Sequence, residues 1–220
     1  QDAAILPSYN RIILDEAHNI EDIATDYFAA RFSHMDLMRL TSRLSTEKKD
    51  HASGKLHILK EKIVKHYRQE HPREITSLLS RLSTDLPGLR HDLLLQARET
   101  FAAYLDFARS MQQTAREDSE EHSPESKLRI LGHHHTSQAW QEKLVPMTKE
   151  LSSSILRFAQ AIASLIFDLK QLSNPQIEEQ TKGITYEITA LAERLKAASA
   201  ILESFISTLI PTMKVRWIEL

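Results

Sequence analysis

Two long apolar stripes in the C-terminal half of the sequence constrain the fold more than any other feature. The first stripe runs from Trp140 to Leu172, and the second runs from Ile184 to Leu209. Apolar residues in the second stripe recur at alternating spacings of four and three residues, which is typical of a helix that packs lengthwise against another helix. Because only the short segment 173–176 separates the stripes, the sequence predicts a long antiparallel helix hairpin.

The rest of the chain is also predicted to be mainly α. It contains four glycines in 220 residues and 41% hydrophobic residues, which favours helices around an apolar core. The polar segment 45–54 is predicted to be a connection, 85–88 a turn, and 116–126 an exposed loop. Ser33 is a suitable N-cap for a helix over residues 34–44. Helices are also predicted over residues 55–70, 74–84 and 89–114, and the first helix of the hairpin is predicted over 137–172.

A small β element completes the predicted fold. Residues 12–14 are apolar, and polar and apolar residues alternate in 127–131 and 213–220, as in half-buried strands. The last two segments are expected to pair with each other. The chain is thus expected to begin and end in strands with a helical body between them. This is the arrangement expected of a domain inserted into an α/β domain, with part of a host strand left at each end. This interpretation divides the chain into residues 1–30, 31–213 and 214–220, and the absence of an initial Met suggests part of a longer protein.

The sequence between Arg11 and Ala24 carries the clearest chemistry, because the apolar run ends in Asp15, Glu16, Ala17 and His18. Ligands of α/β sheets bind at the carboxyl ends of strands. In nucleotide hydrolysis, one carboxylate there holds Mg²⁺ while a second orients the attacking water. The alternative is an acidic first turn of a helix that follows a strand, with Asn19 as its N-cap.

The string ILDEAHNIEDIA resembles motif II, the Walker B segment, of superfamily 2 helicases. It is most similar to the branch that contains the DinG and XPD helicases, and the terminal VRWIEL resembles the segment by which DinG-type arches return to the motor. In that branch, a helical arch domain is inserted between motifs II and III of the first motor domain. The resemblance therefore implies a helical arch, a strand remnant of the α/β motor domain at residues 1–30, and a return strand at 214–220.

The resemblance also implies roles for the acidic residues. Asp15 would coordinate Mg²⁺ bound to ATP, Glu16 would activate water, and His18 would couple hydrolysis to DNA movement. The parent protein would be an ATP-dependent 5′–3′ DNA helicase that uses ATP and Mg²⁺. The phosphate-binding loop is absent from these residues, so the fragment alone is expected to be inactive. Cysteines for the family's [4Fe–4S] cluster lie upstream of motif II, so the resemblance allows a cluster in the parent and places none here.

A basic middle section is the expected partner surface. Residues 31–116 contain 16 Lys and Arg against 10 Asp and Glu, which favours contact with a phosphate backbone. The resemblance implies that the arch guides or gates single-stranded DNA beside the rest of the helicase motor. Lys48, Lys49 and Lys55 are the predicted DNA contacts. The alternative interpretation is an ordinary solvated set of helix faces.

Two further features have a chemical and a structural interpretation. His133–His135 could form a metal site, but consecutive side chains diverge, and a polar loop is the favoured interpretation. Trp140 and Trp217 could stack on bases. Each also fits an apolar stripe, so a position in the core is favoured for both.

The remaining sequence features exclude other classes. There is no cysteine, which excludes disulfides and cysteine-ligated metals within the chain and fits a cytoplasmic protein. No apolar run is long enough to cross a bilayer, so no membrane association is expected. The fragment is expected to be a monomer. Two rival hypotheses stay open: a non-enzymatic helical protein-interaction scaffold, and a metal-dependent hydrolase that uses Asp15, Glu16 and His18 without any motor.

Overall fold

The computed structural model divides the chain into two compact units, residues 1–31 and 32–220. In the first unit, residues 17–19 form a short 3-10 helix, η1 (Ala17–Asn19). The predicted strand at 12–14 lies outside the described residues. The residues that the structure describes are 11, 15, 17–19, 27, 29–48, 51–66, 72–117, 127–172, 175–207 and 215–219.

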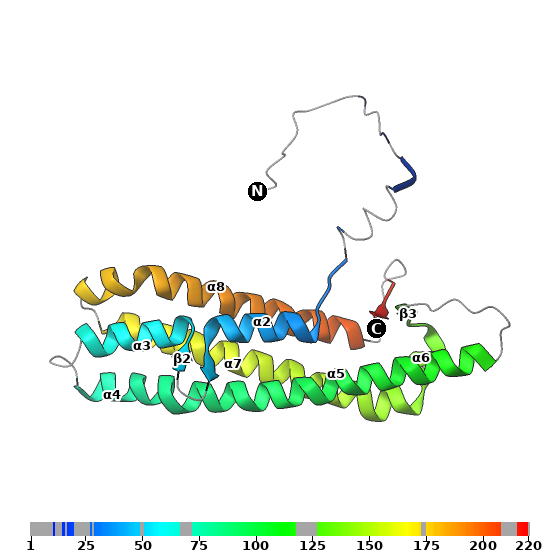
Figure 1. Cartoon of the computed structure of the whole chain (residues 1–220), viewed down its shortest axis with the longest axis horizontal. Helices are drawn as coiled ribbons and strands as arrows, with labels where there is room; N and C mark the ends of the chain where they lie inside the picture. Colours follow the sequence, from blue (N-terminus) through cyan, green and yellow to red (C-terminus); the bar gives the residue numbers. More distant parts are fainter. Residues whose placement is uncertain are drawn as a thin grey trace. The chain divides into compact units, whose positions relative to one another are not determined.

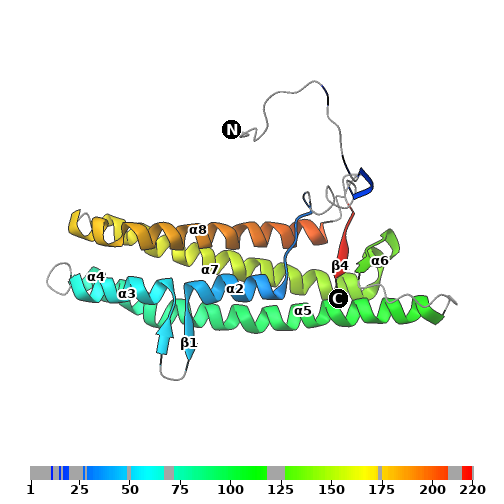
Figure 2. The same cartoon turned by 45° about the horizontal axis from the view of Figure 1, so that its top comes forward.

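The second unit is mainly helical, as predicted, and its described helices form an antiparallel bundle of four rods (Figures 1 and 2). The first rod is α2 (His34–Leu44) followed by α3 (Lys55–His66). The second is α4 (Pro72–Ser80), η2 (Arg81–Asp85) and α5 (Leu86–Glu117). The third is η3 (Ala139–Leu144) and α7 (Val145–Gln171), and the fourth is α8 (Pro175–Ile206). No described helix is long and apolar enough to cross a membrane.

The predicted antiparallel hairpin is confirmed in α7 and α8, which pack along each other. Their apolar stripes enter a leucine-rich core that also receives Leu37, Leu59 and Leu93 from the other two rods. One buried polar contact interrupts the α7–α8 seam: the hydroxyl oxygens of Ser152 and Ser199 lie 2.7 Å apart. The Ser199 hydroxyl donates to the backbone carbonyl of Ser152 at 3.1 Å, which leaves the Ser152 hydroxyl to donate to that of Ser199, so these small residues fix the register of the two helices.

The predicted turn at 85–88 is wrong, because the helix continues through Pro87. The five residues before Leu86 form a π-helix, and the Leu86 N–H donates to the carbonyl of Arg81, five residues earlier. Proline has no N–H, and its ring would clash with the preceding turn of an α-helix. Because the preceding turn is widened into a π-helix, the helix continues past the proline. Pro146 sits in the same relation to η3, where the Val145 N–H donates to the carbonyl of Trp140.

The predicted connection at 45–54 is instead a β-hairpin. Strands β1 (Thr46–Lys48) and β2 (His51–Ser53) pair antiparallel, with Thr46 opposite Ser53, and Figure 2 shows the hairpin at the side of the bundle. Gly54 ends it with φ of 109°, a conformation that residues with a Cβ rarely adopt. A Cβ there would lie 2.7 Å from the Leu44 carbonyl oxygen, so the close return of the chain to α2 depends on glycine.

The predicted pairing of the two later strands is confirmed. Strand β3 (Lys127–Arg129) pairs antiparallel with β4 (Trp217–Glu219), with Leu128 opposite Ile218. Both of these side chains pack on a second, aromatic core. We define the aromatic core by its buried members, which are Ala103, Tyr104, Phe107, Ile130, Trp140, Leu144 and Ile206.

Candidate nucleic-acid interface and the acidic segment

The three predicted catalytic residues belong to the first unit. Asp15 is an exposed turn residue, and His18 is exposed within η1. Glu16 lies outside the described residues. The roles of Asp15, Glu16 and His18 in nucleotide hydrolysis therefore stay a prediction.

The most basic described surface belongs to the first rod of the bundle. Helices α2 and α3 contain six Lys and Arg against two acidic residues, Asp36 and Glu61. Both acids are engaged locally, since Asp36 accepts from the Ser33 N–H at 3.0 Å and Glu61 lies 3.3 Å from His57. We call this surface the basic face; its residues are Arg39, Arg43, Lys55, Lys60, Lys62 and Lys65.

Two lysines of the basic face hold α3 against α8. The ammonium group of Lys55 forms an ion pair with Glu187. Two turns further along α3, the ammonium group of Lys62 donates to the carbonyl oxygen of Gln180 at 2.5 Å. Lys55 is thus already paired within the chain, which reduces the charge that this predicted DNA contact presents.

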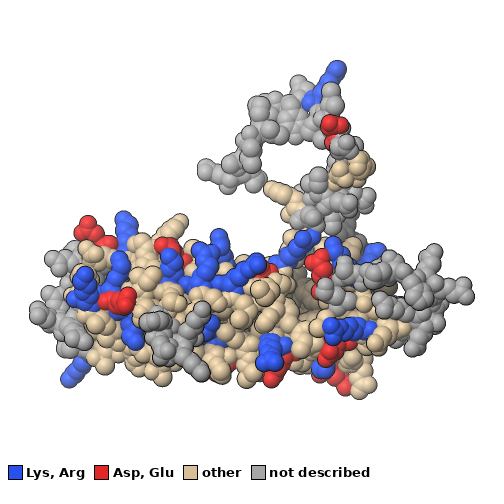
Figure 3. Space-filling model, viewed as in Figure 1, with Lys and Arg blue, Asp and Glu red and all other residues tan. Residues whose placement is uncertain are grey.

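Arg39 and Arg43 are the outward-facing cations of α2. Both are exposed, and they lie one turn apart on the side opposite the buried Leu37, Thr41 and Leu44. Neither guanidinium has an ion-pair partner among the described residues. Figure 3 shows Lys and Arg side chains over the face that carries α2, α3 and α8.

The sequence analysis did not include Arg194 in this surface. It lies in α8, two turns after Glu187 and therefore on the side that meets the first rod. Because α8 packs against both α2 and α3, the exposed Arg194 extends the basic face. No local sequence signal could have found it, since the residues involved are more than one hundred positions apart.

Of the other two predicted DNA contacts, the structure describes the backbone of Lys48. Lys48 is the last residue of β1 and pairs with His51 in the ladder. Lys49 lies outside the described residues. Both stay predicted contacts.

His133–His135 lie in a short helix, α6 (Gly132–Thr136), so the predicted polar loop is wrong here. Residues His134 and His135 are buried, with 7% and 9% of their surfaces exposed. Among the described residues, no three His, Cys, Asp or Glu side chains form a metal-ligand cluster. Trp140 is fully buried in the aromatic core, which confirms the core interpretation for this tryptophan and excludes it as a base-stacking platform.

The chain was compared with known protein families, with characterised proteins and with solved structures, and none of them matches it.

Proposed function

We propose that this chain is the motif II segment and arch domain of a DinG/XPD-like ATP-dependent DNA helicase, and that the basic face guides single-stranded DNA. The observation that carries the proposal is the string ILDEAHNIEDIA, which is followed by a mainly helical body. The parent protein would hydrolyse ATP with Mg²⁺, using Asp15 and Glu16, with His18 coupling hydrolysis to strand movement.

The path of the chain in the second unit supports this proposal. Phe32, where the unit begins, lies 6.1 Å from Phe101 of α5, measured between ring centroids. One turn along α5, the ring of Tyr104 lies 5.7 Å from that of Phe205, near the end of α8. Ile218 of β4 packs on the same aromatic core. The unit is therefore entered and left at one end of its bundle, as expected for a domain inserted into another.

The charge of the basic face supports single-stranded DNA as its ligand. Lys and Arg on neighbouring helical turns match a phosphate backbone, and binding releases the counterions of that backbone. If four of these cations contact phosphates, the affinity falls about 50-fold between about 50 mM and about 200 mM salt.

The test is a binding titration of the whole chain with fluorescent oligothymidine, followed by fluorescence anisotropy at both salt concentrations. The double variant Arg39→Gln/Arg43→Gln should bind about tenfold more weakly at low salt and show a shallower salt dependence. The matched control is Arg98→Gln/Arg109→Gln, which removes the same charge from exposed positions of α5. Equal losses in both double variants, or no measurable binding by the unmodified chain, would overturn the guiding role.

The helicase assignment has a separate test in the longer protein that would contain this chain. There, Glu16→Gln should abolish DNA-stimulated ATP hydrolysis while ATP binding persists. The isolated chain should hydrolyse no nucleotide. Hydrolysis by the isolated chain that Glu16→Gln abolishes would instead support the metal-dependent hydrolase.

Light scattering on the same samples addresses the scaffold hypothesis. The arch proposal predicts a monomer with salt-sensitive DNA binding. Stable self-association of the unmodified chain without DNA binding would favour a non-enzymatic interaction scaffold.

A further inference from the structure

Helix α6 buries two histidines against the aromatic core, at the end of the bundle where β3 and β4 pair. The ring of His135 meets that of Trp140 edge-on, with centroids 4.8 Å apart and an interplanar angle of 80°. The ring of His134 meets that of Phe107 at 84°. Both imidazoles therefore occupy positions that aromatic hydrocarbon side chains usually fill.

The surroundings of the ring nitrogens are compatible only with neutral imidazoles. Neither Nδ1 nor Nε2 of His135 has a hydrogen-bond partner within the described residues, and both are buried. Nδ1 of His134 accepts a hydrogen bond of 3.0 Å from the Leu131 N–H at the start of α6. A proton on that nitrogen would remove the acceptor, and a proton on His135 would leave a buried, unsolvated cation.

The charges around the two rings are cationic. Arg216, just before β4, is buried and donates to the Ser207 carbonyl at 2.7 Å, and its charge acts on His135. The positive charges of His133 and His135, when these residues are protonated, disfavour a proton on His134. Two carboxylates of the adjoining elements are engaged elsewhere: Glu142 of η3 accepts from Gln138 at 2.8 Å, and Glu219 of β4 lies 3.3 Å from Lys127. A third, Asp106 of α5, is exposed to solvent.

We propose that α6, Arg216 and the β3–β4 sheet form a pH-sensitive latch, which is closed while His134 and His135 are neutral and opens when they are protonated. Opening separates α6 and β4 from the aromatic core. The four rods stay folded, because the leucine-rich core contains no residue of α6 or β4.

The direction of the pH effect follows from proton linkage. Burial is the main cause that lowers the pKa of both His134 and His135 below the usual 6.5, and the neighbouring positive charges add to it. The open form titrates near 6.5 and therefore binds more protons than the closed form below that pH. Each histidine then shifts the equilibrium up to tenfold toward opening per pH unit, or about 100-fold for both.

The experiment is a pH titration of the whole chain, from about pH 7.5 to about pH 5, followed by NMR of backbone amides and histidine ring protons. Amide signals of Lys127–Arg129 and Trp217–Glu219 should change together with those of α6, while signals from the middle of α7 and α8 stay constant. The His135 ring should titrate below 6.5 with the same midpoint as the strand amides.

Variants then separate the latch from general acid unfolding. His135→Gln, which stays uncharged, should move the opening to lower pH and halve its steepness. The control His91→Gln removes an exposed histidine of α5, between Leu89 and Leu93 of the leucine-rich core, and should leave the midpoint within a few tenths of a pH unit. The proposal is overturned if His135→Gln opens like the unmodified chain, or if His135 titrates near 6.5 while β4 stays paired. Should His135→Gln fail to fold, the agreement of the two midpoints in the unmodified chain decides.

Discussion

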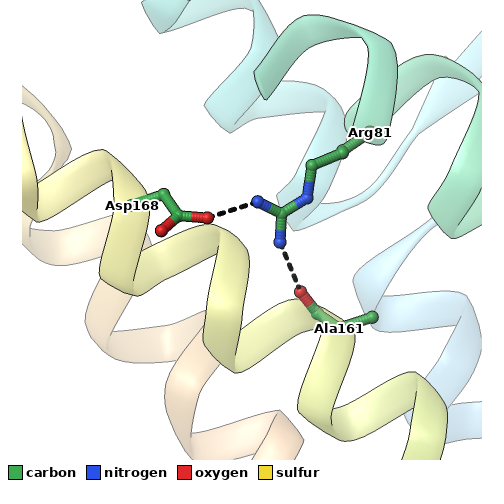
Figure 4. Close-up of polar contacts among 3 residues, drawn as sticks. All are labelled: Arg81, Ala161 and Asp168. Atoms are coloured by element: carbon green, nitrogen blue, oxygen red, sulfur yellow. Dashed lines mark hydrogen bonds and ion pairs between the residues drawn. The ribbon is translucent and has the colours of Figure 1, made fainter. Parts of the chain in front are cut away.

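The guanidinium group of Arg81 joins two rods of the bundle through Asp168. One of its nitrogens, Nη1, lies 2.5 Å from a carboxylate oxygen of Asp168 in α7, and the other, Nη2, donates to the carbonyl oxygen of Ala161 at 3.2 Å (Figure 4). Arg81 is the first residue of the π-helix η2. The widened turn that accommodates Pro87 thus also places a cation between α4 and α7.

Replacing Arg81 with methionine should lower the free energy of unfolding by about 1 kcal/mol, because it removes the ion pair with Asp168 and the hydrogen bond to the Ala161 carbonyl on a half-exposed surface. Urea denaturation followed by circular dichroism measures this loss. Asp168→Asn keeps the bond to Ala161 and should cost less than half as much. If Asp168→Asn costs as much as Arg81→Met, the carbonyl contact contributes nothing.

Gly54→Ala should lower the free energy of unfolding by about 2 kcal/mol. The new Cβ would press on the Leu44 carbonyl, and the backbone would hold a φ that alanine disfavours. The matched control is Gly183→Ala in α8, where no atom outside the local backbone of the helix lies within 4 Å of the added Cβ. That change should instead stabilise the chain by about 1 kcal/mol, since alanine favours a helix interior. Equal effects of the two substitutions on urea denaturation would contradict this account of Gly54.

The free energy of unfolding should decrease at strongly alkaline pH, because Tyr104 ionises there. Its hydroxyl lies 2.6 Å from that of Thr148, whose own proton goes to the Leu144 carbonyl, so Tyr104 is the donor. Burial raises the pKa of Tyr104 to about 12. The unfolded chain ionises near 10, so this contribution is complete below pH 10 and is lost as the pH rises toward 12, about 3 kcal/mol in all.

Tyrosinate absorbance and urea denaturation between about pH 9 and about pH 11 test this expectation. Tyr104→Phe should be less stable than the unmodified chain at neutral pH, because it lacks the bond to Thr148, yet it should lose less stability as the pH rises. Parallel decreases in both proteins would show that other groups cause the alkaline loss.

Glu187→Gln should strengthen the binding of single-stranded DNA. The substitution releases Lys55 from its ion pair and removes a negative charge beside the basic face. We expect the Kd for oligothymidine to fall about threefold at low salt, and less at high salt, where screening weakens both charges. Glu150→Gln, at an exposed position of α7, is the charge-matched control. An equal gain in affinity with Glu150→Gln would indicate that the change in net charge, rather than the release of Lys55, causes the effect.

Local sequence signals were sufficient for much of the fold. Ser33 caps α2, which spans His34–Leu44 as predicted, because an N-cap and an apolar period are properties of adjacent residues. The α7–α8 hairpin and the β3–β4 pairing were also predicted, since a short connection and matched alternation leave few arrangements open. The acidic segment is a sequence signal too, and its chemistry stays a prediction.

Tertiary packing decided what those signals could not. A Pro-Gly pair predicts a turn locally, yet Leu82, Leu86 and Leu93 are buried in the leucine-rich core on both sides of Pro87, and that burial favours a continuous helix with one widened turn. Tertiary packing also brings Arg194 beside the basic face and buries His134 and His135. The reason is the same in each case: apolar burial and charge act through space, between residues that are distant in the sequence.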